Sequence, residues 1–451
     1  MRRVASAGMA DSRRIGRAFS HIAPLSPAGF PAATNVTAAI FTLLFLAALA
    51  ISLAAKLWLA RRQMRFVAAH RAAVPPAFVD RVALAAHQKA ADYTVARTRF
   101  GVAETMVEAV LLLALTLGGG LAALVAWTGS LGLGSLGADL ALVVAVALVA
   151  GIVGLPFSYV NTFGIEAKFG FNRTTRAVWV ADIAKSVAVG AALGLPLAAL
   201  ILWLMRAAGA YWWLWAWLAW MAFQALVLAL YPTVIAPLFN KFSPLPEGPA
   251  RAAIEALLAR CGFANKGLFV MDGSRRSSHG NAFFTGFGRA KRIVFFDTLL
   301  ARLAPEEIEA VLAHELGHFR LHHVLKRMAW SAALGLLFLG LLAVLAAAPW
   351  FYEGLGVPVS PGRPGVALIL FVLALPVFTF MLAPLSSLYS RRHEFEADAF
   401  AARNASATAL VQALVKLYED NASTLTPDPI YSAVYDSHPP AALRIARLRT
   451  S

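Results

Sequence analysis

Charged residues are scarce in this sequence. Only 14% of its 451 residues are Asp, Glu, Lys or Arg, whereas 59% are hydrophobic. A soluble globular domain carries roughly 25% charged residues. A chain of this length could not hide so many apolar side chains in a water-soluble core. The composition therefore excludes an ordinary soluble protein and predicts an integral membrane protein.

Cysteine is nearly absent as well. The single residue Cys261 excludes an intrachain disulfide and a zinc site built from several thiolates. Any metal must therefore be bound by histidine and carboxylate side chains.

Long apolar stretches recur along the chain. A helix that crosses a hydrocarbon core of about 30 Å needs about 20 apolar residues, and we expect about seven such spans. They lie near residues 37–60, 102–127, 137–160, 178–205, 211–231, 328–350 and 365–388. The predicted fold class is mainly α, a polytopic membrane protein of about seven transmembrane helices.

The basic residues are distributed unevenly. The net charge of +16 admits nucleic-acid binding, but eight Arg and Lys residues fall in the loop 61–101 between two spans. The loops predicted on the opposite side carry only Arg206 and Arg363. This asymmetry favours a positive-inside membrane topology, with no nucleic-acid partner and with the C-terminus in the cytoplasm. Residues 1–36 are an exception, since they carry five arginines on the side predicted to be external.

Polar blocks alternate with the apolar spans, and we expect five parts. They are a disordered basic tail (1–36), a membrane domain of about five spans (37–231), a catalytic loop domain (232–327), two further transmembrane helices (328–388) and a C-terminal part of the catalytic domain (389–451). Within the polar blocks, local patterns predict helices over 249–262, 305–325 and 391–418, strands over 267–271 and 292–296, and an edge strand near Asn281–Phe284.

The helix predicted over 305–325 contains the motif His314-Glu315-Leu316-Gly317-His318. Two histidines four residues apart lie on one helix face, so both imidazoles can reach one zinc ion. Zinc lowers the pKa of a bound water to about 7, and the neighbouring Glu315 can accept that water's proton as the oxygen attacks a carbonyl carbon. The alternative is a helix surface with two unrelated histidines.

A catalytic zinc site needs a third protein ligand and an open position for water. Glu394 is the best candidate, and Asp398 lies four residues further along the same predicted helix face. Asp398 would then orient a ligand histidine through its second ring nitrogen. The alternative is a solvated charged helix beyond a membrane span.

Four nearby residues receive no catalytic role from the sequence. His393 and Glu396 point to other faces of the second helix. We expect His322 and His323 to lie at the membrane interface or to line a chamber.

Several segments beyond the zinc motif are similar to one family. They are Tyr231–Phe242 with Pro244–Gly248, Thr162–Glu166 with Gly170–Asn172, and His438–Pro440 with Arg444. Together with the zinc motif they make the chain resemble the type I CAAX prenyl proteases, multi-span zinc metalloendopeptidases of the gluzincin group, over residues 37–451.

This resemblance implies details that spacing alone does not give. Family members enclose a hydrated chamber within seven helices, and the zinc site faces that chamber from the cytosolic side. Asn281 and Ala282 match an edge strand that pairs with the substrate backbone. His438 matches a histidine that stabilises the tetrahedral oxyanion, and Arg444 matches an arginine close to it.

Three alternatives compete with this interpretation. A site-2-type protease also uses H-E-x-x-H, but Glu306, Glu307 and Arg320 make this motif helix amphipathic rather than membrane-embedded. The heat-shock membrane proteases share the zinc pattern without a five-span leader, and their quality-control role is a second candidate. A transporter or channel with a structural metal is the third, although such a site gives no reason for Glu315 to lie between two ligands.

The predicted function is hydrolysis of peptide bonds by an integral-membrane metalloendopeptidase with one Zn²⁺ per chain. Glu315 acts as general base, and His438 and Arg444 stabilise the oxyanion. The resemblance implies peptide or protein substrates prenylated at a C-terminal cysteine. The Ala- and Arg-rich composition favours a bacterial inner membrane, where membrane-protein turnover is the expected task; in a eukaryote we expect the endoplasmic reticulum membrane.

Overall fold

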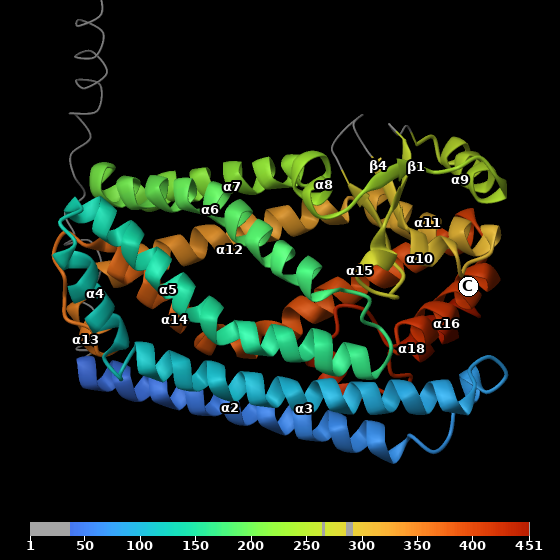
Figure 1. The fold of residues 1–451 in the computed structure, drawn as a ribbon, viewed down its shortest axis with the longest axis horizontal. Coiled ribbons are helices and arrows are strands. Elements are labelled where there is room, and N and C mark those ends of the chain that lie inside the picture. Colours follow the sequence, from blue (N-terminus) through green and yellow to red (C-terminus); the bar gives the residue numbers. More distant parts are fainter. Residues whose placement is uncertain (1–36, 264–266, 286–291, 451) are drawn as a thin grey trace, which may run out of the picture.

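The computed structural model of the chain describes residues 37–263, 267–285 and 292–450. The tail predicted over 1–36 lies outside these residues. Long helices run along the molecule, with α2 (Ala38–Ala69) and α3 (Leu84–Leu115) on one long side and α7 (Trp212–Leu230) on the opposite side (Figure 1). Helix α6 (Arg176–Ala207) packs against α7 and slants toward the middle of the molecule (Figure 1). The strands and several short helices gather at one end, which we call the sheet end (Figure 1).

The described residues contain six helical segments long and apolar enough to cross a membrane, or seven if one bent pair counts as a single span. The six are Ala38–Ala69, Gly134–Glu166, Arg176–Ala207, Gly209–Phe239, His323–Ala346 and Pro364–Asn404. Within them lie α5 (Gly134–Tyr159), α12 (His323–Ala346), α14 (Pro364–Thr379) and α15 (Ala383–Asn404). The prediction of a mainly helical membrane fold with about seven spans is confirmed.

The second predicted span is bent rather than continuous. Helix α3 ends at Leu115, and α4 (Gly120–Ser130) leaves it at an angle of 55°. Gly119 adopts a left-handed conformation with φ of 78°, which glycine accepts without a steric penalty. A Cβ atom on Gly118 would lie 2.8 Å from the carbonyl oxygen of Ala114. The run of glycines over 118–120 therefore breaks the helix within the span predicted near residues 102–127.

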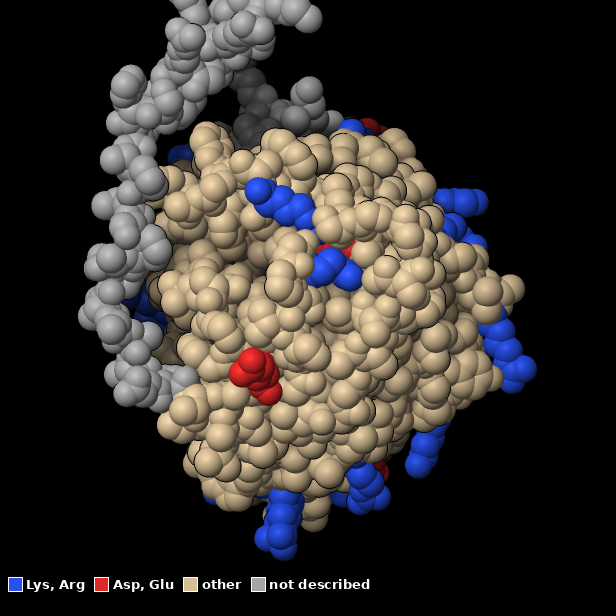
Figure 2. Space-filling model, turned by 90° about the vertical axis from the view of Figure 1, so that its left-hand side faces the viewer, with Lys and Arg blue, Asp and Glu red and all other residues tan. Residues whose placement is uncertain are grey.

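The end opposite the sheet end carries few charged side chains on its surface (Figure 2). Arg206 and Arg363, the two basic residues of the loops predicted on this side of the membrane, lie here. Both contact the carboxylate of Asp139, which has no exposed surface. The Arg363 Nε atom donates at 2.5 Å, and the backbone N–H of Gly365 donates to the same carboxylate at 2.9 Å. These contacts tie α5, α6 and α14 together, and the one carboxylate offsets part of the positive charge of the two arginines.

The sheet end is built on four short strands, β1 (Phe242–Pro244), β2 (Leu268–Met271), β3 (Ala282–Thr285) and β4 (Arg292–Phe296). Their order is β1-β2-β4-β3, with β2 and β4 parallel and the other two pairs antiparallel. The strands predicted over 267–271 and 292–296 are confirmed, and so is the edge strand, since β3 pairs with β4 alone among the described strands.

Helices pack on this sheet around one apolar core. They are α9 (Pro249–Arg260), α10 (Asp297–Leu300), α11 (Pro305–Arg320), α16 (Ala407–Asp420) and α18 (Ala441–Leu448), while α17 (Pro429–Tyr435) contacts α2 and α15. Ile254, Phe295 and Leu316 are each at most 1% exposed in this core. A second core, containing Phe45 and Leu370, joins the membrane helices to α13 (Pro349–Glu353) at the other end.

Two predicted helices are each interrupted. The helix predicted over 305–325 ends at Arg320, because His322 adopts a left-handed conformation and α12 starts at His323. The pattern over 391–418 divides into α15 and α16, and the Ser406 side chain caps α16 by accepting the backbone N–H of Ala409 at 3.1 Å.

Two charged residues within the fourth predicted span have separate partners. Asp182 accepts two hydrogen bonds from Arg276 at 2.7 and 2.9 Å, and Lys185, three residues further on, donates to the carbonyl oxygen of Leu238 at 2.7 Å. These contacts connect α6 to the polar segment that leads into the sheet.

Candidate metal centre

Helix α11 carries the H-E-x-x-H motif into the core of the sheet end. Pro305 occupies its first turn, where a missing N–H costs nothing. The Glu307 carboxylate accepts the backbone N–H of Ala304 at 2.8 Å and pairs with Lys416 of α16 at 2.7 Å. This capped start fixes the helix, in which both His314 and Leu316 are buried although they point in different directions.

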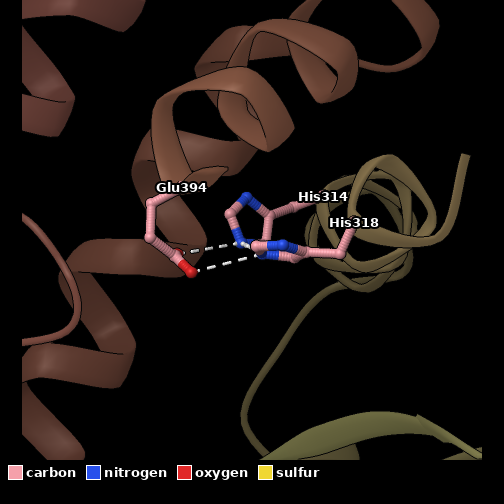
Figure 3. A group of neighbouring side chains, drawn as sticks. All are labelled: His314, His318 and Glu394. Carbon is pink, nitrogen blue, oxygen red and sulfur yellow. Dashed lines mark hydrogen bonds and ion pairs between the residues drawn. The ribbon is translucent and has the colours of Figure 1, made fainter. Parts of the chain in front are cut away.

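The three predicted ligands converge from two helices. His314 and His318 project from α11 toward Glu394 of α15 (Figure 3). Their Nε2 atoms lie 3.2 Å apart, and the Glu394 carboxylate oxygens lie 3.4 Å from His314 Nε2 and 3.3 Å from His318 Nε2. Ligand atoms at 2.0–2.1 Å from one tetrahedral zinc ion would be about 3.4 Å apart. The side chains therefore have the spacing of a three-ligand metal site.

The electrostatics of this cluster also suit a cation. Glu394 is 2% exposed, and its Oε2 atom has no hydrogen-bond partner among the described residues. Burial lowers the pKa of His314, but its hydrogen bond to Asp398 and the nearby Glu394 carboxylate outweigh this effect and raise that pKa to about 9. The surroundings thus stabilise positive charge at the point where His314 and Glu394 meet, and a divalent metal would supply that charge.

A close approach of α11 and α15 brings the ligands together. A Cβ atom on Gly317 would lie 3.0 Å from both the Cα of Ala397 and the Cβ of Phe400. Glycine between the two ligand histidines therefore lets the backbones approach closely enough for Glu394 to reach them.

Asp398 and Arg444 lie behind His314. The His314 Nδ1 atom is 2.8 Å from an Asp398 oxygen, and Arg444 of α18 donates to the same carboxylate at 2.6 and 2.8 Å. All three side chains are buried. This is the orientation that the sequence predicted for Asp398. The Arg444 guanidinium, for which an oxyanion role was expected, makes its two shortest hydrogen bonds with Asp398.

The remaining predicted site residues border one cavity of about 860 Å³. Its lining includes Glu315 and His314 of α11, Asn281 and Ala282 at the sheet edge, and His438. Burial raises the pKa of the Glu315 carboxyl, which favours a proton acceptor with greater basicity than a solvated glutamate.

His438 lies at the accessible side of the cluster. Its Nε2 atom is 3.4 Å from Glu394 Oε2, its Nδ1 atom is 2.9 Å from the Ser437 hydroxyl, and its side chain is 61% exposed. An imidazole in this position can approach a substrate carbonyl beside the metal ligands.

Sequence reasoning missed His323, which contacts the cluster, and Glu396, which contacts His323. His323 lies 2.9 Å from His318 and 3.0 Å from Glu396. His323 does not line the cavity, because its side chain is buried, and it is the first residue of the membrane span His323–Ala346. The doubled histidine at 322–323 was the available signal, but helical spacing places residue 323 on a different face from residue 318.

A cluster of two histidines and a glutamate, with a second glutamate beside a cavity and long apolar helices around it, defines a membrane metallopeptidase. Two family models match the chain, the five-helix N-terminal region of CAAX prenyl proteases over residues 63–241 and peptidase family M48 over residues 244–451. The chain therefore belongs to the CAAX prenyl proteases of peptidase family M48.

Relatives and a solved structure agree with this assignment. CAAX prenyl protease 1 homologues share 41% identity over 310 residues in Oryza sativa (68% of this chain, 72% of the relative) and 34% over 340 residues in Homo sapiens (67% and 72%). CAAX prenyl protease 1 of Saccharomyces cerevisiae shares 36% over 313 residues (66% and 69%). The crystal structure of Saccharomyces mikatae Ste24p superposes with a TM-score of 0.85 at 29% identity, covering 90% of this chain and 99% of that one.

These matches confirm the predicted enzyme class. The chain is a membrane zinc metalloprotease of the CAAX prenyl protease type, and membership of a peptidase family decides against the transporter or channel alternative.

Proposed function

We propose that His314, His318 and Glu394 together bind one Zn²⁺ and that Glu315 is the general base of peptide-bond hydrolysis. The observation that carries this proposal is the meeting of three ligand side chains, whose nearest nitrogen and oxygen atoms lie 3.2–3.4 Å apart in each pair, beside a cavity that Glu315 lines. Zinc, when bound, supplies Lewis acidity that makes a water molecule acidic and polarises the scissile carbonyl.

The protein's own side chains have separate roles in this reaction. The Glu315 carboxylate accepts a proton from the attacking water and later donates it to the leaving amine. The His438 Nε2–H donates a hydrogen bond to the oxygen of the tetrahedral intermediate. Arg444 acts through Asp398, which holds the ring of His314 in one orientation.

Substrate binds along the edge of the sheet. Asn281 and Ala282 border the same cavity as Glu315, and β3 has a partner on only one side among the described strands. An extended peptide can add to this edge as a further strand and bring its scissile bond to the cluster.

The substrate class follows from the relatives, which are named for CAAX prenyl proteases. We infer that the chain cleaves peptides carrying a prenylated cysteine near the C-terminus, with the active site facing the cytoplasm, as the distribution of basic residues favours. Turnover of membrane proteins in a bacterial inner membrane is the second candidate, supported by the Ala- and Arg-rich composition.

The test of this function is the substitution Glu315→Gln, assayed in detergent on quenched peptides. Removal of a general base costs about 10²–10⁴-fold in rate. We expect peptide hydrolysis to fall by that factor while the zinc content stays at the wild-type level, because Glu315 is not one of the three ligands. Equal activity of the variant and the wild type would rule out this mechanism.

A further inference from the structure

The outer nitrogen of each ligand histidine contacts a different partner. His314 Nδ1 faces the Asp398 carboxylate, which itself is bound by Arg444. His318 Nδ1 instead lies 2.9 Å from Nδ1 of His323, and His323 Nε2 lies 3.0 Å from Glu396 Oε2. His323 has no exposed surface.

The break between α11 and α12 creates this contact. Residues five apart on one continuous helix lie on different faces. His322, with φ of 58° and ψ of 30°, turns the chain so that the first residue of α12 packs back against the last turn of α11. His323 thereby reaches His318 although helical spacing would separate them.

The hydrogen bonds allow one consistent assignment of protons when His318 binds a metal through Nε2. His318 must then carry its proton on Nδ1, since a neutral imidazole has one donor and one acceptor nitrogen. The His323 Nδ1 atom accepts the hydrogen bond from this His318 N–H, and the His323 Nε2–H donates to the Glu396 carboxylate. Arg392 fixes the other oxygen of Glu396 at 3.0 Å.

A second metal ion at this position is the competing interpretation. His323, His393 and Glu396 also offer ligand atoms within 4.8 Å of one another. However, the rings of His323 and His393 are stacked, with centroids 4.0 Å apart and an interplanar angle of 10°. The lone pair of an imidazole nitrogen lies in the plane of its ring. The lone pairs of two stacked rings therefore lie in two nearly parallel planes and do not converge on one ion. The stacking instead fixes the plane of His323.

We propose that His323, oriented by Glu396, is a positioning residue that holds His318 in the tautomer and orientation required of a metal ligand. This inference rests on the proposed function, in which His318 binds Zn²⁺. The His323–Glu396 pair then orients the ring of His318, as the Asp398–Arg444 pair orients the ring of His314. Partners of this kind typically contribute 10–100-fold to metal affinity or activity.

The test measures zinc affinity of the full-length protein by competition with a chelator. His323→Ala should lower the affinity about 10–100-fold. His323→Asn should lose less than His323→Ala, because its side-chain oxygen takes the place of Nδ1 as acceptor. Glu396→Ala should also weaken binding, whereas Glu396→Gln, which still accepts from His323, should remain close to wild type.

Controls separate this effect from a general loss of structure. His322→Asn is the matched control, since His322 is exposed and asparagine tolerates its left-handed conformation. We expect unchanged zinc affinity for this variant and an unchanged KM for peptide in all the folded variants. If His323→Ala fails to fold, the zinc affinity of Glu396→Ala tests the proposal instead, because the Glu396 side chain is 32% exposed and tolerates truncation.

Two outcomes would overturn the proposal. One is wild-type zinc affinity in both His323→Ala and Glu396→Ala. The other is a second bound zinc that disappears in His323→Ala while the first is retained with unchanged affinity. Failure of the underlying function gives a different result, since His318→Ala would then keep its zinc.

Discussion

At the scale of single residues, the cluster separates into side chains that would touch the metal and side chains that would touch the substrate. His314, His318 and Glu394 are at most 15% exposed, whereas His438 is 61% exposed and yet lies 3.4 Å from Glu394. A side chain that contacts the substrate must be accessible from the cavity and close to the metal ligands, and His438 meets both conditions. Composition gave no reason to select His438, and only the resemblance to a family did so.

The substitution His438→Ala tests this division. Loss of one oxyanion donor costs about 10²–10³-fold in kcat. We expect that decrease with little change in KM or in zinc content, measured by steady-state kinetics and metal analysis. His70→Ala is the control, because His70 is an exposed histidine that does not border the cavity. A raised KM with an unchanged kcat would contradict the oxyanion role.

At the scale of elements, the site depends on how closely α11 and α15 pack. The sequence predicted a helix at each ligand and the spacing of the two histidines, because both follow from local periodicity. It did not predict the breaks at His322 and at Ser406, since an apolar or amphipathic pattern continues through both positions. The contact of His323 with His318 was missed because it depends on the break at His322. The contact of Arg444 with Asp398 was missed because it depends on packing between elements distant in the chain.

Gly317→Ala tests the packing of these two helices. The added Cβ would lie 3.0 Å from Ala397 and force α15 away from α11, at a cost of about 1–3 kcal/mol for overpacking. We expect lower thermal stability and weaker zinc binding together, because Glu394 moves with α15. The matched control is Gly335→Ala in α12, where the nearest atom is 3.6 Å from the added Cβ. Unaltered zinc affinity in Gly317→Ala would show that the close approach is unnecessary for the site.

At the scale of the whole molecule, the cavity joins the membrane helices to the sheet end. Its lining includes Lys56 of α2 and Arg97 of α3 together with Glu315 of α11. A charged side chain such as Lys56 within an apolar span normally faces water or protein rather than lipid. The predicted chamber among membrane helices therefore corresponds to this cavity, which Glu315 and residues of the membrane helices line together.

A farnesylated peptide ending in Cys-a-a-X tests the substrate class. We expect the wild-type protein in detergent to release the last three residues and the Glu315→Gln variant to be inactive. The measurement is mass spectrometry of the products, with the unmodified peptide as control. Turnover of the unmodified peptide with none of the farnesylated one would contradict the proposal and favour general membrane-protein turnover.

The position of the metal is the most direct test of the whole interpretation. Anomalous diffraction at the zinc edge, from crystals of the wild-type protein grown with zinc, locates the ion without reference to activity. We predict one peak about 2.0–2.2 Å from His314 Nε2, His318 Nε2 and a Glu394 carboxylate oxygen, with Glu315 beside it but not bound. A peak beyond bonding distance of Glu394, or one located only among His323, His393 and Glu396, would contradict it.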